Sequence, residues 1–160
     1  MPSQTRLDAT DARLLLALND RPRATTIALA EHVGLSRNTV QARLGRVEDA
    51  LAAFEHRVTP ESLGYPLTAF VTPPVTQRRL DEVAAALKAV PEILAVHGIS
   101  GQNDLLVHVV AADADDLYRI AGRILAIPGV ERTNTALLMR QLVGYRIAPL
   151  LHRLAERGPR

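Results

Sequence analysis

Residues 25–49 read TTIALAEHVGLSRNTVQARLGRVED, a stretch that predicts two short helices separated by a tight turn. Thr25 can cap the first helix, because its hydroxyl can accept a backbone amide hydrogen at the helix start. Gly34 tolerates the left-handed conformation that commonly ends a helix, and Ser36 can cap the next one. The apolar residues of this second helix follow the i, i+4, i+7 spacing of one helix face: Val40, Leu44 and Val47. The stretch therefore predicts a helix-turn-helix.

Polar side chains face outward on the second predicted helix. At about 100° per residue, the surface opposite Val40 centres on Asn38, Ala42 and Gly45. Amide and guanidinium groups in the first turns of such a helix suit the major groove of DNA, where Asn and Gln can pair with adenine and Arg with guanine or phosphate. An ordinary solvated helix carries similar groups, so it is the Gly-Leu-Ser turn that favours nucleic acid here.

The predicted DNA-binding residues either carry these polar groups or cap the two helices. They are Thr25, Ser36, Arg37, Asn38, Thr39, Gln41, Arg43 and Arg46. The first turns of a recognition helix reach the groove floor, so we expect Arg37, Asn38 and Gln41 to contact bases. Arg43 and Arg46 lie nearer the C-terminal end of the helix, and we expect them to contact phosphates.

The distribution of charge agrees with this location. The 160 residues carry a formal net charge of +2. Residues 1–46 hold seven Arg against four acidic residues, whereas residues 47–75 hold one Arg against four acidic residues. A local excess of positive charge is the expected electrostatic feature of a phosphate-facing module. We therefore expect double-stranded DNA as a partner of the N-terminal part.

Composition excludes several other classes of protein. A hydrophobic content of 48% supports a folded core, and the length allows one domain or two small ones. The absence of Cys excludes disulfides, thiolate chemistry and Cys-based zinc sites. The chain has no signal-peptide pattern and no apolar run of about 18 residues, so we expect a cytoplasmic protein with no membrane partner.

A further helix is predicted before the helix-turn-helix. Asp8 can cap it, and Asp11 lies near the positive end of its dipole. Its apolar stripe comprises Leu14, Leu15 and Leu18. With this helix, residues 1–49 are predicted to form a three-helix DNA-binding domain. Residues 50–65 have neither a clear helix pattern nor a clear strand pattern, and we interpret them as a linker.

From residue 66 the pattern changes to strand, helix, strand, strand, helix, strand. Strands are predicted at 67–75, 93–100, 105–111 and 129–139. Helical spacing predicts one helix beginning near Leu80 and another capped by Asp113. Residues 66–150 are therefore predicted to form a ferredoxin-like βαββαβ domain with a four-stranded antiparallel sheet. Pro149 is expected to interrupt the weak helical pattern that follows, leaving residues 151–160 as a C-terminal tail.

Both helices of such a sandwich cover one face of its sheet and leave the other face bare. The predicted strand 105–111 is apolar in both phases, with Leu105 and Val107 on one face and Leu106 and Val110 on the other. A bare face with β-branched residues is usually covered by another molecule. We therefore expect a homodimer that forms through this face.

The two predicted domains together resemble those of the Lrp/AsnC (feast/famine) family of transcriptional regulators. Residues 7–19 (LDATDARLLLALN) and 23–48 (RATTIALAEHVGLSRNTVQARLGRVE) are similar to the family's N-terminal domain, and the resemblance extends to about Leu150. It implies an α+β chain with a winged helix-turn-helix domain and a ferredoxin-like domain that binds an amino-acid effector. It also implies dimers that assemble into tetramers or octamers. Residues 50–58 lack the two glycines of the family's hairpin strand at this position.

The stretch GISGQND at 98–104 resembles a strand-turn-strand motif near the family's amino-acid site. The resemblance implies an effector site that comprises Gly98, Ser100, Gly101 and Asp104. The chemistry is suitable, because backbone amides at Ser100 and Gly101 could hold a carboxylate while Asp104 accepts from an ammonium group. The alternative is that Gly101 and Asp104 only form the hairpin turn.

The sequence offers little for catalysis, since it has no HExxH motif, P-loop or dinucleotide-binding fingerprint. His97 and His108 form the one pair to consider as metal ligands, and packing or hydrogen bonding explains them more simply. We therefore predict no catalytic residues, no metal site and no cofactor besides the effector. Two alternatives stay open: an enzyme similar to siroheme decarboxylases, whose architecture is alike, and a regulator or chromatin-like architectural protein without an effector.

Overall fold

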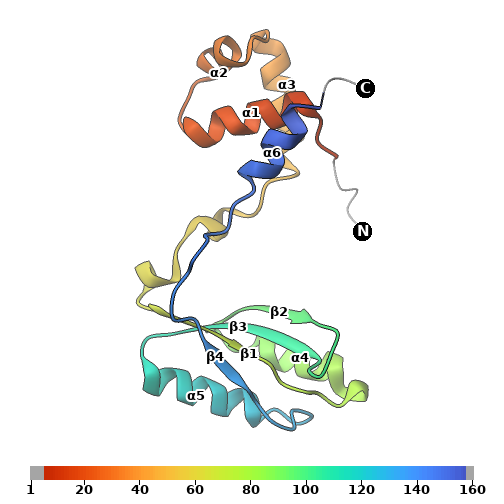
Figure 1. The fold of residues 1–160 in the computed structure, drawn as a ribbon, viewed down its shortest axis with the longest axis vertical. Coiled ribbons are helices and arrows are strands. Elements are labelled where there is room, and N and C mark those ends of the chain that lie inside the picture. Colours follow the sequence, from red (N-terminus) through yellow and green to blue (C-terminus); the bar gives the residue numbers. More distant parts are fainter. Residues whose placement is uncertain (1–5, 158–160) are drawn as a thin grey trace. The chain divides into compact units, whose positions relative to one another are not determined.

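The computed structural model describes residues 6–157, which form two compact units (Figure 1). One unit contains the residues up to Phe54 together with those from Val143 onward, and the other comprises Glu55–Leu142. The sequence predicted a second domain that extends to residue 150, whereas the structure groups the segment from Val143 with the first unit. The reason is a helix near the end of the chain that packs against the first helix.

The first unit is built on three helices: α1 (Ala9–Asp20), α2 (Thr26–Val33) and α3 (Arg37–Glu48). Each begins at a side chain that caps it, as the sequence predicts, and these caps are Asp8, Thr25 and Ser36. Gly34, with a φ of 68°, ends α2 in the left-handed region. The three helices share one apolar core of Leu14, Ala17, Leu29, Ala30 and Val40. The predicted helix-turn-helix is therefore confirmed.

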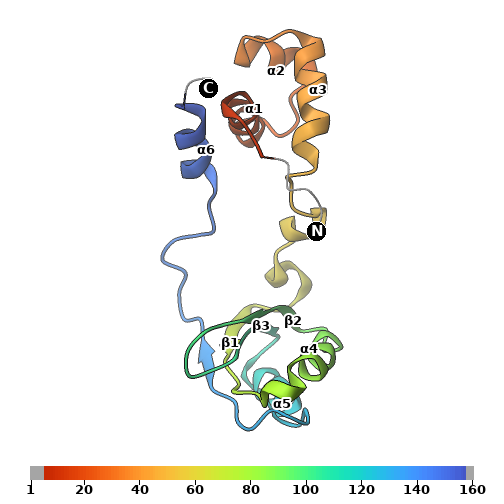
Figure 2. The ribbon, with the colours of Figure 1, turned by 90° about the vertical axis from the view of Figure 1, so that its right-hand side faces the viewer.

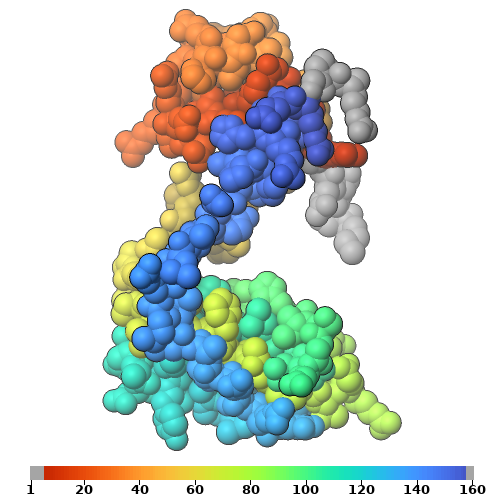
Figure 3. Space-filling view, viewed as in Figure 1, coloured from red at the N-terminus to blue at the C-terminus, as the bar shows by residue number. Residues whose placement is uncertain are grey.

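A fourth helix, α6 (Ala148–Ala155), completes this unit by packing along α1 (Figure 2). The space-filling view shows its blue residues directly against the red residues of α1 (Figure 3). Its half-buried residues recur at helical spacing: Ala148, Leu151, Leu154 and Ala155. The expectation that Pro149 interrupts this segment is wrong, because Pro149 lies in the first helical turn, where no backbone amide is needed.

The segment after α3 contains two 3₁₀ turns, Phe54–Arg57 and Pro60–Leu63. No strand forms in residues 50–66, so the wing that the sequence-based fold class included is not present in this segment. The missing glycines noted in the sequence agree with this result, since a tight hairpin usually needs residues that tolerate positive φ. The remainder of that fold class, a helix-turn-helix unit followed by an α+β unit, is confirmed.

The second unit is a four-stranded antiparallel sheet in the order β2-β3-β1-β4. Its strands are β1 (Leu67–Val71), β2 (Ile93–Gly98), β3 (Leu105–Ala111) and β4 (Thr135–Leu137). The helices α4 (Leu80–Lys88) and α5 (Ala114–Leu125) cover one face (Figure 2). A short 3₁₀ turn, Gln77–Arg79, leads into α4. The predicted βαββαβ order is confirmed.

Three of the predicted strands are shorter in the structure, and β2 ends at Gly98, two residues before its predicted end. β1 ends at Val71, ahead of Pro73 and Pro74, because proline cannot donate a ladder hydrogen bond. The predicted strand 129–139 is reduced to β4, and upstream of it only an isolated bridge joins Val75 to Val130. Gly129 has a φ of 106° there, which interrupts extended backbone.

Alternation along the strands separates the covered face from the uncovered face of the sheet. Ala69, Val71, Val107 and Val109 are buried beneath the two helices. The residues that alternate with them point to the uncovered face, where Val110 is buried and the others are half-buried: Thr68, Phe70, Leu106 and His108. Within residues 6–157, no helix is both long and apolar enough to cross a membrane.

Candidate nucleic-acid interface

The core fixes which side of α3 is presented to a partner. Val40 and Val47 are buried, and Leu44 packs against the same core. The opposite surface is open to solvent along the helix and comprises Arg37, Asn38, Gln41, Ala42 and Gly45. The structure therefore places the three predicted base-contacting residues on an exposed surface, close together in the first turns of α3. Those positions suit side chains that enter a major groove.

A shallow, open hollow runs along this surface and is lined by Asn38, Thr39, Ala42, Arg43 and Arg46. The small Ala42 side chain leaves room between the polar side chains on either side. A Cβ atom added at Gly45 would meet nothing within 4 Å, so this part of the helix has low relief. A surface of this kind allows close approach of a nucleic-acid backbone or base edge.

The three hydroxyl residues in the predicted set have structural duties. Thr25 Oγ1 accepts a hydrogen bond from the Ala28 amide at 3.2 Å and so caps α2. Ser36 Oγ accepts from the Thr39 amide at 3.1 Å and lies 2.8 Å from Thr39 Oγ1. These hydroxyls remain exposed at helix N-termini, where the dipole and free amides favour an anion such as phosphate.

Arg43 and Arg46 contact acidic residues of the same unit. Arg43 Nη1 donates to Asp8 Oδ2 at 2.5 Å and to Asp11 Oδ1 at 2.8 Å. Arg46 Nη2 donates to the backbone oxygen of Arg6 at 2.8 Å, and its guanidinium lies 3.7 Å from Asp8 and 3.6 Å from Asp11. Sequence reasoning assigned both arginines to phosphate and did not find these ion pairs, because their partners lie more than 30 residues away in the chain.

The ion pairs change the acidity of the groups that form them. The Arg43 guanidinium lowers the pKa of Asp8 to about 2, an effect that partial burial opposes and that hydrogen bonds from the amides of Asp11 and Thr10 reinforce. The hydrogen bonds that Arg43 donates to the carboxylates of Asp8 and Asp11 raise the pKa of Arg43. Asp8 is thus a carboxylate, and Arg43 a cation, at any physiological pH.

The predicted effector residues lie together at one end of the β2–β3 hairpin. Gly98 ends β2, while Ser100 and Gly101 are exposed in the turn, where Gly101 has a φ of 123°. The Ile99 amide donates to the Asp104 backbone oxygen at 2.9 Å and closes the turn. Turn formation is therefore one role of this motif.

The Asp104 side chain already has two partners. Its Oδ2 accepts from the Val75 amide and its Oδ1 accepts from Gln77 Nε2, both at 2.7 Å. These bonds join the hairpin turn to the loop before α4, a connection that the sequence alone did not reveal. Each carboxylate oxygen can accept more than one hydrogen bond, so Asp104 retains acceptor capacity for a ligand.

His97 and His108 lie on the uncovered face of the sheet, because His97 pairs with Leu106 two residues from His108. The His108 ring stacks on Phe70 with a centroid separation of 4.9 Å. Burial, and to a smaller extent the nearby His97, lowers the pKa of His108. Among the residues that the structure describes, no three His, Cys, Asp or Glu side chains gather in a way that could hold a metal ion.

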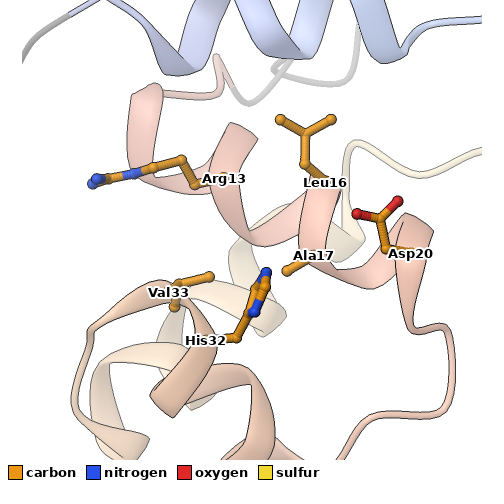
Figure 4. Close-up of a pocket in the computed structure, with 6 residues that line it drawn as sticks. All are labelled: Arg13, Leu16, Ala17, Asp20, His32 and Val33. Atoms are coloured by element: carbon orange, nitrogen blue, oxygen red, sulfur yellow. The ribbon is translucent and has the colours of Figure 1, made fainter.

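Another hollow, of about 350 Å³, lies between α1 and α2 (Figure 4). It is open to solvent and is lined by Arg13, Leu16, Ala17, Asp20, His32 and Val33. The labelled side chain of Arg13 extends away from the Asp20 carboxylate, so the two do not converge on a common point (Figure 4). The hollow therefore lacks the converging polar groups that characterise a ligand site.

Comparison with known proteins agrees with the two-unit architecture. Residues 7–48 match the model of the AsnC-type helix-turn-helix domain, and residues 68–147 match that of the Lrp/AsnC ligand binding domain. The chain belongs to the Lrp/AsnC family. It is a DNA-binding transcriptional regulator and not an enzyme, a class with which the names of its relatives agree. The alternative of an enzyme similar to siroheme decarboxylases is thereby set aside.

Individual relatives cover nearly the whole chain. The HTH-type transcriptional regulator FL11 of Pyrococcus horikoshii is 28% identical over 136 residues, which cover 84% of this chain and 90% of the relative. Escherichia coli AsnC has the same fold, with a TM-score of 0.81 at 22% identity over 90% of this chain and 99% of that one.

Two other solved structures contain an amino acid. A transcriptional regulator of Neisseria meningitidis in complex with L-methionine has a TM-score of 0.77 and 27% identity, over 93% of this chain and 100% of that one. A feast or famine regulatory protein of Mycobacterium tuberculosis, complexed with L-methionine, has a TM-score of 0.73 and 29% identity, over 89% and 98%.

Proposed function

We propose that this Lrp/AsnC-family chain is a sequence-specific transcriptional regulator whose DNA binding or assembly responds to an amino acid. The observation that carries sequence-specific binding is the exposed surface of α3, where Arg37, Asn38 and Gln41 stand next to a low-relief centre at Ala42. Side chains of these types can form bidentate contacts with guanine and adenine edges. Such a regulator acts in the cytoplasm, where bacterial and archaeal DNA lies.

Two copies of α3 in a symmetric dimer would contact half-sites about one turn of DNA apart, on a roughly palindromic operator. The uncovered sheet face supports the dimer, because half-buried Phe70 and Leu106 lie on it without a covering helix. Family membership supports further assembly of dimers into tetramers or octamers.

An α-amino acid suits the β2–β3 turn as an effector. The backbone at Ser100 and Gly101 is exposed, and amides there can hold a carboxylate. The free acceptor capacity of Asp104 can receive an ammonium group. The L-methionine complexes of two relatives support a ligand of this class.

One experiment tests operator binding and the effector together. Duplexes selected by the purified chain from a random library are titrated with protein in the absence and presence of each of the twenty amino acids, and the affinity and assembly state are recorded. We expect a selected consensus with two-fold symmetry and a change in affinity or assembly with at least one amino acid. Selection of no consensus would refute sequence-specific binding, and no response to any amino acid would favour an effector-independent regulator.

The variant Asp104→Ala locates the effector site. It should alter the response to the active amino acid, or the assembly state, and leave the DNA-binding unit folded, because Asp104 lies in the other unit from α3. The matched control is Asp115→Ala, which removes an exposed carboxylate from the first turn of α5. A wild-type response and assembly in Asp104→Ala would leave the turn with only its structural role.

A further inference from the structure

The ion-pair cluster of the DNA-binding unit contains two cations and two anions. Its members are Arg43 and Arg46 on α3 and Asp8 and Asp11 at the start of α1. Asp11 is completely buried, so its charge depends on the neighbouring guanidinium groups for compensation. The Arg43 side chain is 26% exposed, less than the 44% of Arg46. Arg43 is therefore the inner member of the pair, and it bridges both carboxylates.

The two carboxylates also determine where α1 begins. Asp8 Oδ1 accepts from the amides of Thr10 and Asp11, each at 2.9 Å. Asp11 Oδ2 accepts from the Asp8 amide at 3.0 Å, which completes a reciprocal capping box. Arg43 is thus bonded to the part of α1 whose backbone is most firmly fixed. This contact is made from the middle of α3, so it ties the body of that helix to the start of α1.

Such an environment is poorly suited to a phosphate contact. Arg43 Nη1 already donates to both carboxylates, and their negative charges would repel a phosphate that approached this guanidinium. We propose that Arg43 is a positioning residue, which fixes the orientation of α3 so that Arg37, Asn38 and Gln41 enter the groove together, and that it contributes no phosphate contact of its own. The proposal rests on the proposed function and revises the sequence-based role of Arg43.

The variant Asp8→Asn separates positioning from phosphate contact, because the two roles predict changes of opposite sign. Asn is as good an N-cap as Asp, so α1 keeps its start while Arg43 loses one anionic partner. If Arg43 positions α3, affinity for the selected duplex falls about tenfold, the value of one well-formed base contact, although the protein becomes more basic. Affinity for a scrambled duplex and the dependence of affinity on salt concentration stay unchanged.

The matched control is Asp20→Asn, which removes the same charge from the exposed end of α1, outside the cluster. Its affinity should equal or slightly exceed that of the wild type on both duplexes. Tighter binding of Asp8→Asn than of this control on both duplexes, with a steeper salt dependence, would show Arg43 to be a phosphate contact that Asp8 restrains. Equal affinity of Asp8→Asn and the control on the selected duplex would also overturn the proposal.

A second variant keeps the proposal testable if Asp8→Asn fails to fold. Arg43→Lys keeps the positive charge but cannot bridge two carboxylates with a planar fork. Positioning predicts weaker binding to the selected duplex with the salt dependence retained, whereas a phosphate contact predicts nearly unchanged affinity on both duplexes. If the wild-type chain itself prefers no duplex, the proposed function fails, and the orientation of α3 can then be compared by the near-ultraviolet and nuclear magnetic resonance spectra of the free variants.

Discussion

Single residues of the DNA-binding unit fall into those that form the fold and those left free for DNA. Thr25 and Ser36 cap helices, and their identity follows from local rules that a sequence displays directly. The outward direction of Asn38 and Gln41 was also predictable, because helical periodicity and a buried Val40 determine it. The partners of Arg43 were not, since an ion pair between distant residues depends on how α1 and α3 pack.

The free residues lead to a prediction about DNA recognition. Replacement of Asn38 or Gln41 by Ala should cost about 1 to 3 kcal/mol of binding free energy on the selected duplex, with little change on a scrambled one. Arg46→Ala should weaken binding to both and flatten the salt dependence, because Arg46 is the more exposed arginine of the cluster and the better placed for phosphate. Titrations of both duplexes over a series of salt concentrations test this, and equal losses on the two duplexes for Asn38→Ala would mean that it contacts only backbone.

The low pKa of Asp8 leads to a prediction about stability and pH. A carboxyl whose pKa is about 2 in the folded chain and about 3.9 when unfolded stabilises the fold above pH 4, and this contribution is lost as the pH falls toward 2. Because the Asp8 side chain is 44% exposed, solvent screening reduces it to about 1 kcal/mol. Urea unfolding should therefore find Asp8→Asn less stable than wild type by that amount at pH 7, with the difference narrowing below pH 4. A constant difference across this range would contradict the prediction.

At the scale of elements, hydrophobic periodicity and capping residues predicted most helices and strands. The main exceptions are residues 129–139 and residues 148–155. β3 has the predicted bounds because Leu105, Val107 and Val109 alternate along it and are buried in the core. β4 is short and exposed. Residues 129–139 were predicted to form one strand because their apolar side chains resemble those of a buried strand. Residues 148–155 have a weak apolar pattern, and their helix is stabilised by contact with α1, which local sequence does not encode.

Because α6 packs against α1, we expect it to stabilise the DNA-binding unit. Leu151 is half-buried in it, whereas its neighbour Leu150 is 59% exposed and provides a matched control on the same helix. Leu151→Ala should lower the free energy of unfolding of this unit by about 1 to 2 kcal/mol, and Leu150→Ala by less than about 0.5 kcal/mol. Thermal unfolding followed by circular dichroism tests the pair. Equal effects of the two variants would show that α6 does not depend on this packing.

At the scale of the whole molecule, the sheet leaves one face without a covering helix. The sequence predicted this face from the βαββαβ order, since two crossover helices of that order lie on the same side. The structure agrees in that α4 and α5 both contribute to the core beneath Val107 and Val109. The other face can be covered only by a second molecule. The identity of that molecule cannot be predicted from local sequence patterns. Half-buried Phe70, Leu106 and His108 on this face favour another copy of the chain.

A charge introduced on the uncovered face should therefore prevent dimerisation. Leu106→Arg places a guanidinium on the uncovered side of the inner strand β3, where burial in a dimer would leave it without a partner, at a cost of several kcal/mol. Tyr118→Arg introduces the same charge at an 84% exposed position of α5 and serves as the control. Light scattering at micromolar concentration and physiological salt should find dimers or larger assemblies for wild type and Tyr118→Arg, and monomers for Leu106→Arg. A monomeric wild type would refute dimerisation altogether, and an intact Leu106→Arg dimer would place the interface on another surface.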